Sequence, residues 1–472
     1  MTATEVPENE RTTPSAGGGG LDSFFKLTER GTTVGTELKA GLATFMVMSY
    51  ILVVNPSILS AMFIPEGDAA VVAFVAPAAA ATALVAGILC IAMGLVSNYP
   101  IAMAAGLGIN GAVAFGLVLG QGLSPAGAMG VIVLEGLVVL VLVLVGLREA
   151  IMNAVPLALK RAIGVGIGLF ILFIGLVDAG VIINAPDDSG PVPVLFQFPN
   201  TPALGIFFAG LLITIVLMVR RVPGALILSI IATTILALVF GVQPVPESFT
   251  SPLDFSTLGD VDVTNVFATL GLTAALLTIF SFMLTDFFDT MGTATGLVEQ
   301  AGLNDEQGRV PGVGRVLLVD SAGAALGGAA GISSNTSYIA SAAGIAEGGR
   351  TGLTAVVVGV LFLLSILLSP LATLVPFVAT GPVLVVIGYL MAVLIREIDF
   401  ADIEEGLPAL LTLALMPLTF SITIGIGAGF VTWVIIKIAL GKLAAIHPLM
   451  WLVALAFVIY FAQALLPGGI SA

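Results

Sequence analysis

Apolar stretches long enough, or nearly long enough, to cross the ~30 Å hydrocarbon core of a bilayer recur along the whole chain. Of its 472 residues, 58% are hydrophobic and only 9% are charged. Because no water reaches the backbone inside a bilayer, its polar groups must be satisfied within helices. The sequence therefore predicts an all-α polytopic membrane protein and excludes the soluble enzymes.

The predicted helical segments are near 40–60, 70–95, 101–119, 125–147, 161–182, 203–219, 223–242, 264–285, 310–328, 331–346, 351–372, 377–396, 407–423, 424–441 and 447–466. If the N-terminus is cytoplasmic, the basic residues of the loops fall on one side: Lys26, Arg30, Lys39, Arg148, Lys160, Arg161, Arg220, Arg221, Arg309, Arg315, Arg350, Arg396, Lys437 and Lys442. The opposite loops, at 66–68, 186–190 and 244–262, carry no Lys or Arg. The positive-inside rule therefore predicts a cytoplasmic N-terminus in the cell membrane.

The two ends of the chain differ from the apolar body. Residues 1–23 are predicted to be a disordered tail, because the first of them are rich in Glu, Thr, Pro and Gly and lack the apolar core of a cleaved signal. The following segment is either a short amphipathic interfacial helix or a solvated leader. The last segment, 447–466, either spans the membrane, lies in its interface or re-enters it.

Two segments, 101–119 and 328–346, are short, interrupted by glycine and carry a central asparagine. In secondary transporters, paired short and broken segments at corresponding places in two inverted halves mark the binding site. Here they are the third and tenth segments, seven apart, and an odd number of helices inverts the second copy. The alternative is that the small residues only allow close helix packing.

The sequence TDFFDTMGT at 285–293 places Asp286 and Asp289 at the end of an apolar run. Residues three apart share roughly one face of a helix, and neither acid has a Lys or Arg within a turn. Ionisable groups in a membrane segment are by default functional, and these are suited to binding a proton and a polar solute. The alternative is a helix that ends before Asp286 and leaves both acids in a loop.

Four long motifs in order resemble the nucleobase-cation symporter family, most closely its AzgA-type branch of adenine, guanine and hypoxanthine permeases. They are ERGTTVGTELKAGLATFMVMSYILVVNPSIL (29–59), AAGLGINGAVAF (104–115), TDFFDTMGTATGLVEQAGL (285–303) and NTSYIASAAGIAEGGRTGLTAVVVGVLFLL (335–364). The resemblance implies fourteen helices in two inverted repeats of seven, with short strands before the broken third and tenth helices. It also implies a homodimer in which a core domain moves like an elevator against a gate domain.

The implied domain boundaries follow the predicted segments. The core would comprise 24–150 and 264–372, and the gate 151–263 and 373–472, including the extra C-terminal segment.

The resemblance also implies the ligands and their site. The substrate would be a purine nucleobase imported by proton symport, with Na⁺ as the other possible coupling ion, and no cofactor, metal or nucleic acid is expected. By motif, Asp289 corresponds to the acid that binds the base, and Asn110 to the polar residue of the third helix. Asp289 and Asp286 are the expected proton-coupling acids. The remaining residues expected at the substrate are Tyr338, Ile339, Thr336 and Ser337, together with position 340. Tyr50 and either Phe287 or Phe288 are candidates for stacking on the purine, the alternative being that these aromatic side chains only pack between helices.

One position departs from the family pattern. The AzgA-type branch has an acid in a Ser-Tyr-Ile-Glu-Ser order, whereas this chain reads SYIAS with Ala340 in its place. The explanations left open are a natural variant with a changed substrate, such as xanthine, uracil or an anion; a compensating acid such as Asp286; and an engineered substitution.

Two other functional classes compete with purine transport. An anion transporter or channel would want a cation near the broken helices, and no Lys or Arg occurs in 101–119 or 328–346. A membrane enzyme would need a nucleophile, a metal cluster or a phosphate loop, and the sequence shows none. The single histidine, His447, precedes a proline at a predicted helix start, which favours an interfacial role.

Overall fold

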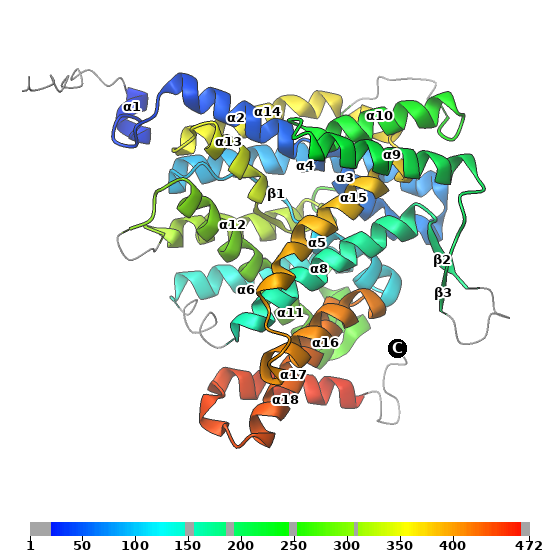
Figure 1. Ribbon diagram of the computed structural model, residues 1–472, viewed down its shortest axis with the longest axis vertical. Helices are drawn as coiled ribbons and strands as arrows, with labels where there is room; N and C mark the ends of the chain where they lie inside the picture. The colour runs from blue at the N-terminus through cyan, green and yellow to red at the C-terminus, as the bar shows by residue number, and fades with distance from the viewer. Residues whose placement is uncertain (1–19, 147–154, 186–192, 245–252, 306–309, 464–472) are drawn as a thin grey trace, which may run out of the picture.

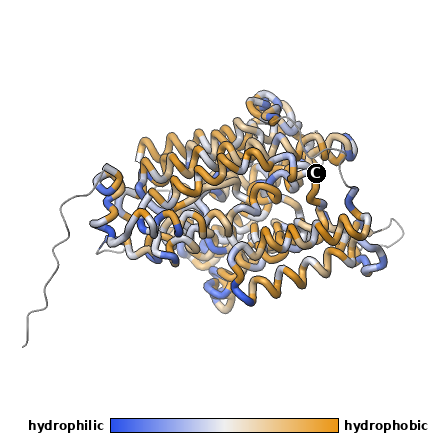
Figure 2. Tube along the Cα trace, turned by 90° about the horizontal axis from the view of Figure 1, so that it is seen from above, coloured by the Kyte–Doolittle hydropathy of each residue, from blue (hydrophilic) through white to orange (hydrophobic). Residues whose placement is uncertain are grey.

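The computed structural model describes residues 20–146, 155–185, 193–244, 253–305 and 310–463 (Figure 1). Within these ranges, nine helical stretches are long and apolar enough to cross a membrane, which confirms the predicted helical membrane protein. In Figure 2 hydrophobic residues cover most of the helices, and hydrophilic ones gather at helix ends and connections. The predicted tail up to residue 19, the loop at 186–190, Arg148 and Arg309 lie outside the described residues.

The elements of the first half, in chain order, are α1 Gly20–Phe25, α2 Val34–Met48, α3 Ile51–Ser60, η1 Ala61–Glu66, α4 Asp68–Ser97, β1 Met103–Ala105, α5 Leu107–Gly111, η2 Ala112–Gly120, α6 Pro125–Leu144, α8 Leu157–Asp178, β2 Ile182–Asn184, β3 Val194–Phe196, α9 Pro202–Val219 and α10 Ala225–Val239. Those of the second half are α11 Val263–Gln300, α12 Val313–Ala329, β4 Asn335–Ser337, η3 Ile339–Ser341, α13 Ala342–Ala346, α14 Gly352–Ser365, η4 Ile366–Leu374, α15 Phe377–Ala392, η5 Val393–Glu397, α16 Ile403–Thr419, α17 Ile422–Ala439, η6 Leu443–Ala445 and α18 Pro448–Gln463.

Two short strands pair at the centre of the fold. β1 and β4 are antiparallel, with Met103 opposite Ser337 and Ala105 opposite Asn335. Each strand leads into short helical pieces, α5 and the π-helix η2 after β1, and η3 and α13 after β4. All six strand residues are buried. The strands expected before the third and tenth segments are therefore present, and their pairing brings the two broken segments together.

Close helix packing around this pair depends on glycine. Helix α4 packs against α14, and a Cβ on Gly352 would lie 1.9 Å from the carbonyl oxygen of Gly94. Helix α6 packs against α12, where a Cβ on Gly136 would lie 2.5 Å from the backbone nitrogen of Ala325. Small residues allow such backbone contact in membrane bundles. In the broken tenth segment, a Cβ on Gly344 would likewise lie 2.5 Å from the carbonyl oxygen of Ala40, so the small residues of this segment also serve close packing.

Several helix limits differ from the predicted ones. The segment predicted to end at 285 continues as α11 to Gln300, with one non-helical residue at Gly271, so Asp286 and Asp289 do not lie in a loop. Helix α1 begins at Gly20, inside the tail predicted to extend to residue 23. Within the predicted segment 447–466, α18 packs against α17, where the rings of Phe457 and Phe430 have centroids 6.3 Å apart.

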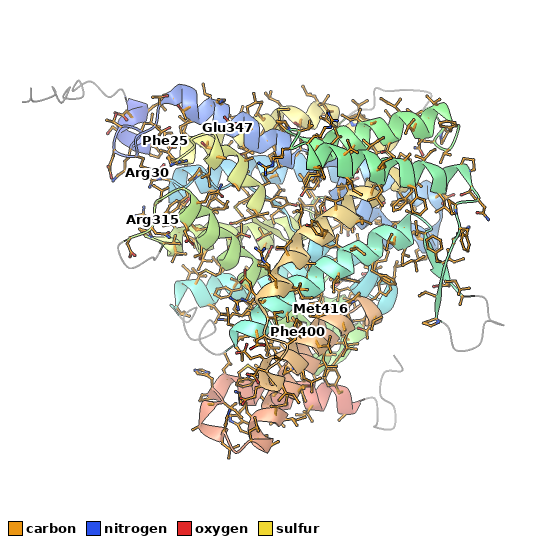
Figure 3. All side chains as sticks on the ribbon, viewed as in Figure 1. Phe25, Arg30, Arg315, Glu347, Phe400 and Met416 are labelled. Carbon is orange, nitrogen blue, oxygen red and sulfur yellow. The ribbon has the colours of Figure 1, made fainter. Side chains whose placement is uncertain are left out.

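Basic residues of widely separated segments lie at one end of the molecule. Figure 3 places Arg30 and Arg315 together with Glu347 at this end. The Arg30 guanidinium donates to the carbonyl of Arg350 at 2.9 Å, joining the chain before α2 to the start of α14. The Glu37 carboxylate accepts from the backbone amide of Arg350 at 2.8 Å.

Candidate functional site

Strand β4 is fixed from behind by an acid on α12. One carboxylate oxygen of Asp320 accepts from the Ser337 amide at 2.9 Å and from the Ser337 hydroxyl at 3.0 Å. The other accepts from the Thr290 hydroxyl at 2.6 Å, and Thr290 lies 2.6 Å from the hydroxyl of Thr336. The hydroxyls of Thr336 and Ser337 therefore serve this internal network and position the strand.

Asp289 occupies a different environment on the same helix. Its side chain is exposed to solvent, although protein atoms surround it closely. On the chain after β4, Ile339 is 63% exposed and Ala340 is half-buried. Tyr338, the first residue after the strand, is close enough to Asp289 to interact with it electrostatically. The carboxylate and the start of the broken tenth segment therefore share one accessible region.

Two tyrosines close the inner side of this region. The Tyr338 hydroxyl donates to the Ala105 carbonyl at 2.9 Å, and its amide donates to the Ala102 carbonyl at 2.9 Å. The Tyr50 phenol lies beside the Tyr338 phenol and is 6% exposed. The structure thus brings Tyr50 together with Tyr338, two of the residues expected at the substrate.

Asn110 lies inside the protein and is not exposed to solvent. It is fully buried on α5, and its amide nitrogen donates to the side-chain oxygen of Asn55 on α3. Asn55 in turn donates to the Thr82 hydroxyl at 2.8 Å. The Asn110 side-chain oxygen has no protein hydrogen-bond partner among the described residues. Asn110 therefore links the broken third segment to α3 and keeps one acceptor free.

Phe287 is not brought to this site. It is buried in the main core, with its ring centroid 5.6 Å from that of Phe288. At about 100° per residue, Phe287 points roughly 200° around the helix from Asp289. Phe288 is half-buried, and the Lys160 ammonium lies 5.3 Å from its ring centroid.

Asp286 and Asp289 lie about 60° apart around α11, but only Asp286 is fully buried. The Ser334 hydroxyl, directly before β4, donates to one oxygen of Asp286 at 3.1 Å. Glu135 on α6 is also fully buried and acts electrostatically on Asp286. Within the described ranges, no three His, Cys, Asp or Glu side chains are grouped to hold a metal ion.

Comparison with known proteins decides the family. A family model described as the permease family matches residues 35–434. Adenine permease AdeP of Escherichia coli is 39% identical over 452 residues, covering 96% of this chain and 98% of the relative. Guanine/hypoxanthine permease PbuG of Bacillus subtilis is 37% identical over 445 residues, covering 93% and 99%. The chain belongs to this permease family. The resemblance drawn from the four motifs is thereby confirmed.

The fold of the permease is similar to that of solved transporter structures. The transmembrane domain of the cyanobacterial bicarbonate transporter BicA aligns with a TM-score of 0.59 at 15% identity, covering 84% of this chain and 97% of that one. The murine anion transporter Slc26a9 in its inward-facing state gives a TM-score of 0.59 at 11% identity, covering 92% and 74%. At these identities the likeness concerns the fold alone.

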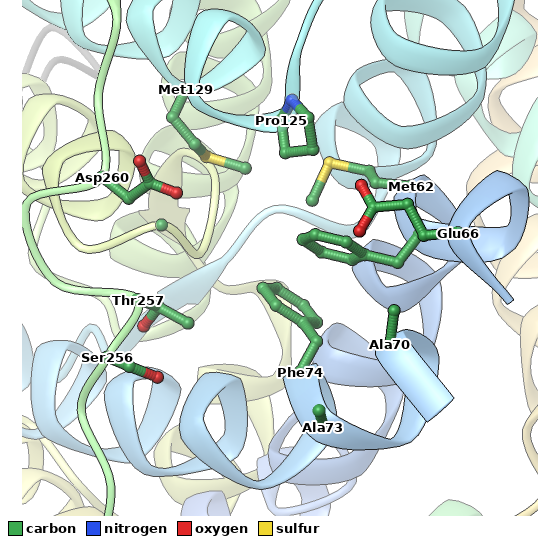
Figure 4. Close-up of a pocket in the computed structure, with 12 residues that line it drawn as sticks. Met62, Glu66, Ala70, Ala73, Phe74, Pro125, Met129, Ser256, Thr257 and Asp260 are labelled. Atoms are coloured by element: carbon green, nitrogen blue, oxygen red, sulfur yellow. The ribbon is translucent and has the colours of Figure 1, made fainter. Parts of the chain in front are cut away.

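A separate pocket of the permease lies at loops that carry no basic residue (Figure 4). Its volume is about 320 Å³, and its walls come from η1, the starts of α4 and α6, and the 256–260 segment. The rings of Phe63 and Phe74 have centroids 4.8 Å apart within it. Glu66 and Asp260 place carboxylates on its rim, and the Thr257 hydroxyl is unpartnered among the described atoms.

Two acids of the permease were not singled out from its sequence. Asp320 stands alone in VGRVLLVDSAGAALGGA, and Glu135 stands alone in PAGAMGVIVLEGLVVLVLVL. Both are buried beside the broken tenth segment. The signal that could have found them is the one that marked Asp286, an acid inside an apolar run.

Proposed function

We propose that this permease is a secondary active transporter that imports purine nucleobases by proton symport. The observation that carries the proposal is the placement of Asp289, an enclosed but accessible carboxylate beside Tyr338 and the start of the broken tenth segment. Relatives named as adenine and guanine/hypoxanthine permeases align over nearly their whole length, which supports the purine class.

A purine suits the groups of this region. Its ring N–H and exocyclic amine are donors that an oxygen of Asp289 accepts, and its ring nitrogens are acceptors to which the O–H of a protonated Asp289 donates. Its carbonyl or ring nitrogens are acceptors for amides at the start of η3, because the first amides of a helix lack intrahelical partners. Tyr50 and Tyr338 provide a rigid wall beside these polar groups.

Proton coupling is proposed for Asp289 because no cation pairs with it. Among the described residues, the ion pairs are those of Lys26, Lys39, Arg161, Lys437 and Lys442, and none involves Asp289. A carboxylate that enters the membrane with its substrate costs less free energy when it carries a proton. A sodium ion is the alternative coupling ion.

The proposed movement is an elevator motion of core against gate, with the two halves as inverted repeats of a fourteen-helix homodimer. The paired strands join the two halves of the core at the substrate. The core and gate divisions proposed are 24–150 with 264–372, and 151–263 with 373–472. The fold shared with BicA and Slc26a9 supports this architecture.

Ala340 supports a second candidate, a transporter of this fold with a changed substrate such as xanthine, uracil or an anion. Alanine offers no acceptor at a half-buried position beside exposed Ile339. An anion is disfavoured here because Asp289 would repel it and no Lys or Arg occurs in 101–119 or 328–346.

An uptake panel tests the proposal. Cells or vesicles that express the permease are given radiolabelled adenine, guanine, hypoxanthine, xanthine, uracil or sulfate, with and without a protonophore. We expect uptake of at least one of the first three, reduced by the protonophore. Uptake of uracil or sulfate without any purine would contradict the substrate class, and insensitivity to the protonophore at constant voltage would contradict proton coupling.

A further inference from the structure

A cluster of buried acids lies behind β4, away from the accessible face of Asp289. Glu135 of α6 and Asp286 of α11 are each 0% exposed. Both carboxylate oxygens of Glu135 and one of Asp286 have no protein hydrogen-bond partner among the described residues. An unpaired buried carboxylate is costly, so these oxygens require a ligand that carries positive charge or a donor.

Within the described parts of the chain, the charged groups that act on this pair are all acids. Glu135 is influenced by Asp320, and Asp286 by Glu135, Asp320 and Asp289. Helix α6 contributes only Glu135, and the adjacent η2 contributes no titratable residue. Asp320 already accepts three hydrogen bonds from Thr290 and Ser337, so its own charge is accommodated. The pair therefore faces only further negative charge.

The Ser334 hydroxyl lies beside both carboxyls. It donates to Asp286 at 3.1 Å and also lies beside Glu135. A hydroxyl has one proton to donate and lone pairs that accept, so it cannot donate to both acids. It can, however, accept from a protonated Glu135 while donating to Asp286. The preceding residue, Ser333, holds a left-handed φ of 68°, a strained conformation that places Ser334 at the entrance to β4.

We propose that Glu135 and Asp286 share one proton through Ser334, and that this proton, additional to that of Asp289, fixes β4 for substrate binding. In one arrangement Glu135 is protonated and donates to Ser334, which donates to Asp286. Moving each proton one step along the chain gives the reverse arrangement, with Asp286 protonated and Glu135 accepting from Ser334. Either form leaves a single negative charge on the pair.

The shared proton connects to the substrate through the strand. Ser334 directly precedes Asn335, the first residue of β4, and the strand ends next to Tyr338. When the proton is lost, two facing carboxylates repel each other and Ser334 can satisfy only one of them. The start of β4 is then displaced, and purine affinity falls. This consequence rests on the proposed function, whereas the shared proton itself does not.

The first measurement detects the proton itself by infrared spectroscopy of the purified protein. Near neutral pH the wild type should show the carbonyl stretch of a buried protonated carboxyl. The band should be lost in both Glu135→Gln and Asp286→Asn, because each leaves a lone acid that accepts from Ser334, and it should survive in Asp289→Asn. A band unchanged in both Glu135→Gln and Asp286→Asn would overturn the shared proton, whether or not any purine binds.

The second measurement is purine affinity against pH, by calorimetry with the purine that the wild type binds. In Glu135→Gln the new side-chain amide donates to Ser334 as a protonated carboxyl does, so this variant should bind near neutral pH within about threefold of the wild type. At alkaline pH, the factor by which its affinity falls for each pH unit should be about ten times smaller than in the wild type, because one fewer proton is linked to binding. Asp178→Asn, at an acid in α8 outside this cluster, should keep the wild-type slope.

A Glu135→Gln variant with the wild-type slope would overturn the link to β4. If this variant does not fold, Asp286→Asn is measured in its place, with the same expected slope. A wild type that binds no purine would contradict the proposed function, and the infrared result would still decide the shared proton.

Discussion

The carboxylate of Asp320 accepts a 2.9 Å hydrogen bond from the backbone amide of Ser337 and thereby ties α12 to β4. In a membrane interior, a strand of three residues has few partners for its backbone, so an acid that accepts both the amide and the hydroxyl of Ser337 determines where the strand lies. Position 337 is followed directly by Tyr338, which lies in the proposed purine site. An interior hydrogen bond thus sets the geometry of the accessible surface.

Asp320→Asn should weaken purine binding although Asp320 is not proposed to touch the purine. The neutral amide loses the charge-assisted bonds from Ser337 and Thr290. If these bonds stabilise the position of β4, their loss weakens purine binding by about 1.5–3 kcal/mol. We expect purine affinity to fall by about tenfold or more, measured by calorimetry. Asp260→Asn, at an exposed position of the 256–260 segment, is the control and should bind as the wild type does. Unchanged affinity in Asp320→Asn would show that β4 is positioned without this bond.

Asp289→Asn keeps the shape of the side chain and removes its charge and its proton site. Purine binding or uptake should fall by about tenfold or more, which corresponds to ~1.4 kcal/mol, because the variant cannot take up the coupled proton. Because Asp289 is solvent-accessible, the variant should unfold at nearly the wild-type temperature. The measurement is initial uptake normalised to the amount of protein in the membrane. Wild-type uptake would remove Asp289 from the site.

Asn110→Ala should change the ranking among purines more than it changes expression, because the free side-chain oxygen of Asn110 is an acceptor near the broken third segment. The same substitution also removes the bond to Asn55. Asn55→Ala is therefore the matched control, since it removes that bond and leaves the Asn110 side chain. If Asn110→Ala lowers expression while the ranking stays as in the wild type, the residue is structural.

Ala340→Glu restores the acid of the family pattern and should tighten purine binding or raise transport. Position 340 is half-buried beside exposed Ile339, so a carboxylate there can reach the accessible region without being fully buried. A charge-assisted bond to a purine N–H contributes about 1.5–3 kcal/mol, which corresponds to roughly tenfold in affinity or more. The measurement is the purine affinity of the wild type and of Ala340→Glu by calorimetry, with Ala340→Gln as the uncharged control. Weaker binding by a folded Glu form would mean that this site differs from the family pattern.

The sequence predicted those parts of the site that leave a local signal. Glycine-interrupted segments with central asparagines indicated the two breaks, and two acids three residues apart indicated the α11 site. The pairing of Met103 with Ser337 could not be predicted by local reasoning, because it joins segments more than two hundred residues apart. The family motif brought in Phe287, and its placement depended on which face of α11 is turned to the core.

Glu135 and Asp320 are site residues that local sequence reasoning missed. Each is a single acid in an apolar run, and nothing nearby in the sequence shows what it meets. Their roles arise only when α6, α11 and α12 pack together around the turn before β4. Some helix ends also differ from the predicted ones, most clearly that of α11, which continues to Gln300. A polar segment can remain helical when neighbouring helices provide partners for its side chains.

Proton movement during purine uptake tests the central claim most directly. Purified permease is reconstituted in liposomes at clamped voltage, a purine is added outside, and external pH is recorded together with uptake of the labelled base. Symport predicts that the outside becomes more alkaline as purine enters, with about one proton or more per purine, and that Asp289→Asn loses both signals. Purine uptake at the wild-type rate with no accompanying proton movement would contradict the account.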